Sequence, residues 1–155
     1  MKMLLKWLIA VLVAITATAG PLLAQAHSTA AEAQQMASEA LAYVKQVGLQ
    51  QAFEDFTAPG GKWHNKELYV FCYNFDGTCV CQGGNKGLVG KNLLDFKYPD
   101  GEMRNKQMIE VAKTKGSGWV EYQWTHPETK KVATKATWVV KIPNYDGFLA
   151  VGYYK

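Results

Sequence analysis

The chain has 155 residues, 48% of them hydrophobic, and its 17 basic and 13 acidic residues give a net charge of +4. This length and composition fit one globular domain that is large enough to build its own core. The excess charge is small, and Lys2 and Lys6 supply part of it, which argues against a nucleic-acid-binding surface.

The first 26 residues have the pattern of a signal peptide. Two lysines precede an uncharged apolar run, and Ala24-Gln25-Ala26 supplies the small residues that signal peptidase recognises. The alternative is an uncleaved anchor, but the run is shorter than the roughly 20 residues that a membrane span needs, and Pro21 interrupts it. We therefore predict a signal peptide over residues 1–26 and a periplasmic domain over residues 27–155, with no transmembrane segment in the mature chain.

Helices are expected at the start of the mature chain. Residues 28–47 repeat apolar side chains at a spacing of three and four, which predicts one long amphipathic helix. Ser28 or Thr29 can cap its start, Glu32 stands at the capping-box spacing from Thr29, and Gly48 suits the position that ends a helix. The apolar spacing continues as far as Phe56, so a second, short helix is expected before the Pro59-Gly60-Gly61 stop.

The rest of the chain is mostly extended. Turn residues and β-type runs predict two strands, over residues 67–75 and 78–82, followed by a loop-rich insert with a helix over residues 102–115. Three further strands are expected over residues 119–125, 132–142 and 148–154. The short connections require antiparallel neighbours. The expected fold is α+β, with a long N-terminal helix, about five antiparallel strands, helices packed on one face, and a helical or loop insert after the second strand.

Three cysteines lie on the first hairpin, and the turn decides their pairing. A two-residue turn would place Cys72 opposite Cys81, where a disulfide can form. The sequence Asn74-Phe-Asp-Gly77 instead favours a type I turn with a bulged glycine, which places Cys72 opposite Val80. Cys79 and Cys81 are then neighbours on the other face, as small core residues or as a soft metal or redox pair. We favour the core interpretation and predict no metal site.

The stretch Gly87-Leu-Val-Gly-Lys-Asn92 places glycines beside a lysine, which raises the question of a phosphate-binding loop. That motif requires a glycine and a hydroxyl residue at the positions that Asn85 and Asn92 occupy here. The motif is therefore absent. No catalytic set is recognisable either, so we expect a protein that is not an enzyme and needs no cofactor.

Several motifs resemble, in order, the single Cache domains of bacteria, and most nearly their second subtype: ELYVFCYNFDGTCVCQGGNKGLVGKNLLDFKYPDG, GSGWVEYQWTHPETKK, Lys135 and VGYY. The resemblance covers essentially residues 27–155. It implies a PAS-like fold and an extracytoplasmic sensor of small organic acids. Two features depart from the family pattern. No membrane helix or signalling module follows, which we interpret as a free-standing secreted form, and Gln82 stands where the family often has histidine.

The resemblance also implies which residues contact a ligand. Lys135 lies inside an otherwise apolar strand, where an unpaired ammonium is unfavourable, so a bound carboxylate would explain it. Tyr122 and Gln82 would donate hydrogen bonds, and Trp124 and Phe71 would form apolar walls. Lys91 would add a second charge from the loop that closes the pocket.

The same residues also have purely structural explanations. Tyr122 and Trp124 are also explained as core aromatics, with Lys135 on the solvent face of the sheet. Lys91 is also explained by an ion pair with Asp95, one helical turn later, or by simple exposure to solvent.

The function expected from these features is non-catalytic binding of a small anionic metabolite in the periplasm, read by a separate membrane-bound receptor or kinase. Nucleic acid is excluded as a partner. The alternatives are a structural or protein-interaction module with a degenerate pocket, and a periplasmic thiol or metal protein that uses Cys79 and Cys81.

Overall fold

The computed structural model describes residues 27–155, so the expected signal peptide over residues 1–26 lies outside the described residues. Within residues 27–155, no helix combines the length and apolar character that crossing a bilayer requires.

Two consecutive helices, α1 (Ala30–Val47) and α2 (Leu49–Thr57), form where the apolar spacing predicts them. The capping box is present: the Thr29 hydroxyl accepts from the Glu32 N–H at 3.2 Å, and the Glu32 carboxylate accepts from the Thr29 N–H at 2.7 Å. Gly48 separates the two helices at a φ of +86°, which is accessible to glycine at little steric cost. The apolar stripe of α1 is buried as expected, through Ala33, Met36, Ala37, Ala40 and Val44.

The sheet is antiparallel throughout, with the strand order β1-β2-β6-β5-β4 and β3 paired to the edge of β2. This arrangement confirms the α+β, PAS-like fold class. The two-residue strand β1 was not expected, since it is too short to show an alternating pattern. The strands are β1 (His64–Asn65), β2 (Leu68–Asn74), β3 (Cys79–Gln82), β4 (Ser117–Thr125), β5 (Val132–Lys141) and β6 (Gly147–Tyr154).

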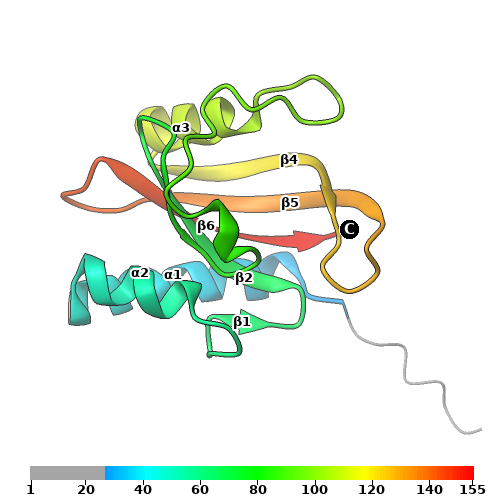
Figure 1. Cartoon of the computed structure of the whole chain (residues 1–155). Coiled ribbons are helices and arrows are strands. Elements are labelled where there is room, and N and C mark those ends of the chain that lie inside the picture. The colour runs from blue at the N-terminus through cyan, green and yellow to red at the C-terminus, as the bar shows by residue number, and fades with distance from the viewer. Residues whose placement is uncertain (1–26) are drawn as a thin grey trace, which may run out of the picture.

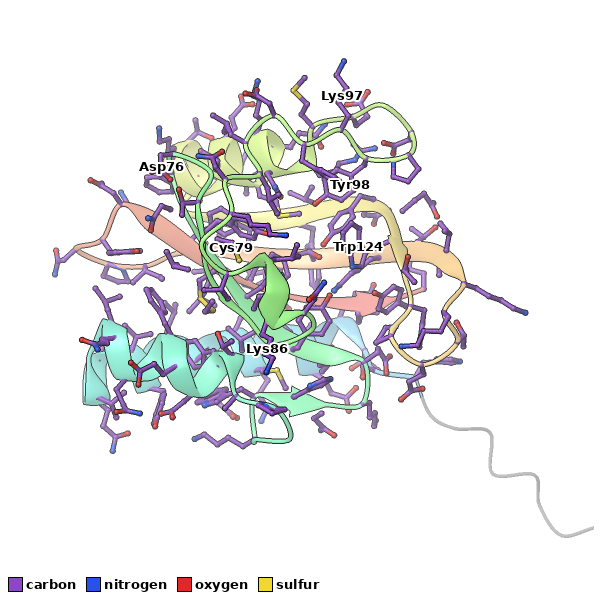
Figure 2. The ribbon with its side chains drawn as sticks, viewed as in Figure 1. Asp76, Cys79, Lys86, Lys97, Tyr98 and Trp124 are labelled. Atoms are coloured by element: carbon purple, nitrogen blue, oxygen red, sulfur yellow. A yellow bond between two sulfur atoms is a disulfide. The ribbon has the colours of Figure 1, made fainter. Side chains whose placement is uncertain are left out.

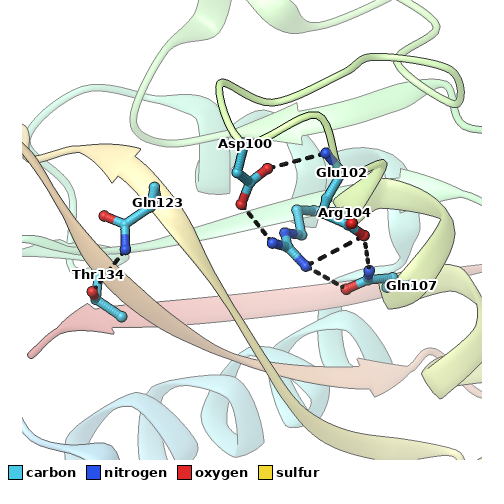
Figure 3. A network of polar contacts seen from close by, with 6 residues as sticks. All are labelled: Asp100, Glu102, Arg104, Gln107, Gln123 and Thr134. Carbon is cyan, nitrogen blue, oxygen red and sulfur yellow. Dashed lines mark hydrogen bonds and ion pairs between the residues drawn. The ribbon is translucent and has the colours of Figure 1, made fainter.

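The insert between β3 and β4 contains the 3-10 turn η1 (Lys86–Leu88) and the helix α3 (Arg104–Lys115). The helix begins two residues later than predicted, because the preceding turn holds Glu102. The Glu102 N–H donates to the Asp100 carboxylate at 3.1 Å, and the Glu102 carbonyl accepts from the Tyr98 N–H at 3.0 Å. Arg104 then bonds back to Asp100 at 2.5 Å (Figure 3). Gly116, at a φ of +77°, ends the helix as expected.

Helices cover both faces of the sheet, so the prediction that they pack on one face was wrong. Helices α1 and α2 lie on one side and α3 with its loop lies on the other (Figure 1). We call these the helix-covered face and the cavity face. The central strand β2 is buried on both sides, with Val70 and Cys72 on the first face and Tyr69, Phe71 and Tyr73 on the second. The sequence did not reveal that both faces of β2 are buried, because aromatic and aliphatic residues alternate along the strand and together look like one continuous apolar run.

The first hairpin contradicts the predicted cysteine arrangement. The turn itself is as expected, with Gly77 at a φ of +91° and the Asn74 N–H donating to the Thr78 carbonyl. A second bulge then follows at Val80, so that Tyr73 pairs with Cys79 and Cys72 pairs with Cys81. The last pair forms a disulfide, with 4.8 Å between the Cα atoms.

The bulge at Val80 arises because β3 bonds on its outer edge to the following loop. The Cys79 N–H donates to the Lys91 carbonyl at 2.9 Å, and the Cys79 carbonyl accepts from the Gly90 N–H at 2.8 Å. The extra residue also moves Cys79 to the cavity face and Cys81 to the helix-covered face, so these two cysteines are not same-face neighbours.

Candidate functional site

A small cavity of about 60 Å³ lies between the cavity face of the sheet and the loop that carries η1 and leads to α3. Most of its walls are aromatic, which gives it an apolar body with polar tips. It is lined by Tyr69, Phe71, Tyr73, Gln82, Leu88, Leu93, Phe96, Tyr98, Asn105, Tyr122 and Trp124.

Four of the six sequence-predicted ligand residues line this cavity: Phe71, Gln82, Tyr122 and Trp124. Lys91 does not. Its side chain is exposed and lies outside the cavity lining, and Asp95 pairs with Lys106 at 2.7 Å instead. The loop therefore closes the cavity through Leu88, Leu93 and Phe96 and adds no lysine charge to the lining.

Lys135 lies directly behind the cavity wall. It is fully buried on the cavity face, and its Nζ donates to the Tyr69 hydroxyl at 2.7 Å. The ammonium also lies over the rings of Tyr69, Tyr154 and Phe71, with centroids 3.9, 5.3 and 5.6 Å away. These rings supply cation–π attraction but no compensating negative charge.

Gly152 on β6 makes room for the Lys135 side chain. A Cβ at this position would lie 2.4 Å from Lys135 Cε and 2.4 Å from the Thr137 hydroxyl oxygen. Only glycine therefore lets the lysine lie across the neighbouring strand. The VGYY motif thus has a structural purpose that its sequence alone does not reveal.

The electrostatics of this region follow from burial. Loss of hydration lowers the pKa of Lys135 to about 7, and the nearby carboxylate of Glu67 partly opposes the shift. Burial raises the pKa of Tyr122 to about 12, with the hydrogen bond to Thr137 acting in the opposite direction. Burial likewise raises the pKa of Tyr69 well above its usual value. Both tyrosines therefore keep their hydroxyl hydrogens at neutral pH.

Both phenol hydroxyls are oriented by groups behind the cavity. The Tyr69 oxygen accepts from Lys135, and the Tyr122 oxygen accepts from the Thr137 hydroxyl at 3.1 Å. Each phenol therefore retains its own hydrogen for donation. The side-chain oxygen of Gln82 accepts from the Gly84 N–H at 3.2 Å, which leaves its amide nitrogen without a partner in the described part of the chain.

Sequence reasoning found Phe71 on β2 but missed Tyr69 and Tyr73 on the same strand, and it missed the cavity residues that come from the insert. Tyr69 and Tyr73 alternate with Val70 and Cys72, and this aromatic alternation was a usable signal for one wall. Tyr98 gave no such signal, because it reaches the cavity only through the loop. Its hydroxyl bonds to Asn105 at 3.3 Å, and its ring lies against that of Trp124, with centroids 5.3 Å apart (Figure 2).

A polar network fixes the turn that carries Tyr98. Arg104 bonds to Asp100 and to the Gln107 side chain, and Gln107 bonds in turn to Glu102 at 3.1 Å (Figure 3). The hydrogen bond from Arg104 lowers the pKa of Asp100 below its usual value. The turn is therefore tied to the first turn of α3.

The structure contradicts the thiol or metal interpretation of Cys79 and Cys81. Cys81 is consumed in the disulfide, and Cys79 is buried beside Tyr73, where burial raises its pKa to about 11. A thiol with a raised pKa is a poor nucleophile and metal ligand. No group of three or more His, Cys, Asp or Glu side chains suited to a metal ion occurs within residues 27–155.

Comparison with known proteins gives a consistent family. The sequence profile described as a Cache domain matches residues 19–155. The sensor histidine kinase MctS of Rhizobium johnstonii is 31% identical over 91 residues, which cover 59% of this chain and 20% of that protein. The chain thus matches about a fifth of the length of this curated relative.

Solved structures share the fold. A methyl-accepting chemotaxis protein from Vibrio parahaemolyticus has a TM-score of 0.68 at 20% identity, covering 80% of this chain and 86% of that one. A Cache chemosensory domain, described with the structural basis of its carboxylic acid recognition, has a TM-score of 0.66 at 23% identity. That match covers 77% of this chain and 86% of the other.

Proposed function

This chain belongs to the Cache domain family, and from that premise we propose that it is an extracytoplasmic sensing domain that binds a short-chain carboxylate in the cavity described above. The family's chemoreceptor and histidine-kinase relatives carry such domains as signal inputs. A bound ligand would be read by a membrane-bound receptor or kinase. The Cys72–Cys81 disulfide supports a location outside the cytoplasm, because disulfides persist in oxidising compartments.

The observation that carries the proposal is the buried Lys135 behind a cavity lined with hydrogen-bond donors. Tyr69 and Tyr122 present hydroxyl hydrogens, and Gln82 presents an amide, while no acidic side chain lines the cavity. Donors backed by a positive charge complement a carboxylate, which only accepts hydrogen bonds. Lys135 acts here mainly through the Tyr69 hydroxyl, which it polarises.

The size of the cavity limits the ligand. At about 10–15 Å³ for each water-sized sphere, a volume of about 60 Å³ admits a ligand of roughly four to six non-hydrogen atoms. Acetate and propionate are acids of this size. Larger ligands would need the loop to move, or would have to extend beyond the cavity.

Isothermal titration calorimetry with acetate and propionate tests the proposal. Lys135→Met keeps the apolar stem and removes the charge, so it is expected to weaken binding by roughly tenfold to a hundredfold, as for the loss of a charge-assisted hydrogen bond. Lys91→Met is the matched control, because it removes a lysine charge that lies outside the cavity lining, and it should lower affinity much less.

Unchanged affinity for Lys135→Met would contradict the assignment of the site. Failure of the wild-type domain to bind any acid of two to four carbons would favour the alternative, an interaction module with a degenerate pocket.

A further inference from the structure

A second cavity of about 350 Å³ adjoins the first, and we call it the vestibule. The two cavities share Tyr69, Gln82, Leu88 and Trp124 as lining residues, so these side chains form the wall between them. On its other side the vestibule is bounded by the end of β4 and the loop between β4 and β5, which contribute residues 125–127 and Lys130. A ligand held in the inner cavity thus has the vestibule as the adjacent space.

His126 lines the vestibule and carries a buried hydrogen-bond donor without a partner. The side chain is only 5% exposed, and its ring packs on Tyr154 with centroids 4.5 Å apart. Its Nδ1 faces the N–H groups of Glu128 and Thr129, at 3.2 and 3.4 Å, and accepts from them. The ring hydrogen therefore resides on Nε2. Within residues 27–155 this Nε2 has no hydrogen-bond partner, although it is buried.

A buried donor without a partner is unfavourable, so this Nε2–H requires an acceptor. The charges around the vestibule indicate which kind. Lys130 is the charged side chain among the vestibule residues, and no acidic side chain lines the space. Lys130 is held at a φ of +58°, in a turn closed by the Lys130 N–H donating to the His126 carbonyl at 3.0 Å. The Nε2–H of His126 and the ammonium of Lys130, which lines the same cavity, together suit an anionic oxygen.

We propose that the vestibule is a second carboxylate subsite, in which His126 Nε2–H and Lys130 hold the distal carboxylate of a short dicarboxylate. This inference rests on the proposed function, since the first carboxylate occupies the inner cavity beside Tyr69, Tyr122 and Gln82. The chain between the two carboxylates passes the shared wall. The domain thereby distinguishes a dicarboxylate from a monocarboxylate of equal length.

Calorimetry with succinate and butyrate tests this selectivity, because the two acids have four carbons each and differ at one end, carboxylate against methyl. The wild-type domain is expected to bind succinate at least tenfold more tightly than butyrate. His126→Asn keeps an oxygen that can accept from the Glu128 and Thr129 N–H groups but lacks the Nε2–H donor. It should remove most of the preference for succinate and leave butyrate affinity within about twofold.

His126→Gln is the matched control, because its amide nitrogen can take the place of Nε2 while the Nδ1 acceptor is lost. It should retain most of the preference for succinate. Lys130→Met leaves the ring and its hydrogen bonds intact and should reduce the preference by a smaller factor, which keeps the test valid if a His126 variant folds poorly.

The outcomes separate the two proposals. If propionate or butyrate binds but succinate binds no better, or if His126→Asn weakens both acids equally, the vestibule is not a carboxylate subsite, and the inner site stands. If none of the acids binds the wild-type domain, the proposed function itself fails.

Discussion

The two faces of the sheet differ in what they bury. The helix-covered face holds aliphatic and aromatic side chains together with the Cys72–Cys81 disulfide. The cavity face buries Lys135, Thr137 and Asn105 among several tyrosines and leaves space between them. Strand β2 contributes to both faces through alternate residues, so the difference is set by the side chains and not by the strand.

The comparison indicates that stability and binding are assigned to opposite sides of one sheet. Close-packed apolar side chains stabilise the fold, whereas a buried ammonium and a cavity both reduce stability. The cavity face keeps these unfavourable features because a ligand can compensate for them. Three predictions test whether the two faces are separable in this way.

The largest effect is expected on the helix-covered face. Phe56 is 1% exposed and packs edge-to-face on Trp63. Phe56→Ala should therefore reduce the free energy of unfolding by about 3–5 kcal/mol, measured by urea denaturation. Phe96→Ala is the control, because Phe96 is 43% exposed and lines the cavity. It should cost less than about 1 kcal/mol, and an equal loss for both variants would contradict the division between the faces.

The disulfide should contribute the next largest effect. It closes a loop with a sequence separation of 9 residues. The double variant Cys72→Ala/Cys81→Ala is expected to lose about 2–3 kcal/mol of unfolding free energy, by the chain-entropy argument. Reductant should lower the melting temperature of the wild type and of Cys79→Ala, but not that of the double variant. A melting temperature of the wild type that does not respond to reductant would show that the disulfide adds no stability.

The smallest effect is a dependence of stability on pH that arises on the cavity face. Burial lowers the pKa of Lys135 to about 7 from its ordinary value of 10.5. Between these values the unfolded chain binds more protons than the folded one, so the free energy of unfolding rises with pH. The expected rise is about 2 kcal/mol between pH 7 and pH 9. Above that range, the raised pKa values of Cys79 and the buried tyrosines act in the opposite direction.

Lys135→Met isolates this contribution. The variant should lack most of the rise between pH 7 and pH 9 and should be at least as stable as the wild type at pH 7, measured by urea denaturation at each pH. The same substitution is expected to weaken carboxylate binding, so stability and binding should change in opposite directions. A variant that kept the full pH dependence would show that another group causes it.

Local patterns predicted much of the fold. The stripe of α1, its capping box and the glycines that end helices depend on residues within a few positions of one another, and they were read correctly. For Lys135 the sequence left two positions open, inward toward a ligand or on the solvent face, and the structure shows that the side chain is buried. Contacts between distant segments could not be predicted from the sequence. The donation from Lys135 to the Tyr69 hydroxyl joins strands 66 residues apart in the chain. The space that Gly152 leaves for the Lys135 side chain depends on the register of β6 against β5.

The hairpin shows where local reasoning reaches its limit. The turn at Asn74–Gly77 was predicted correctly, yet the cysteine pairing derived from it was wrong. One additional bulge at Val80 changes the register, and with it the face on which each cysteine lies. This bulge depends on hydrogen bonds between Cys79 and the loop at Gly90 and Lys91, which no turn rule contains.

The sequence by itself determined the order of the longer helices and strands, the turn at Asn74–Gly77 and the family, because these depend on short-range periodicity, glycine positions and ordered motifs. The tertiary structure decided which groups meet. It places Lys135 behind the Tyr69 hydroxyl, joins Cys72 to Cys81, and leaves the buried Nε2 of His126 without a partner beside the cavity. These features depend on burial and on strand register, which are properties of the packed sheet and not of any single segment.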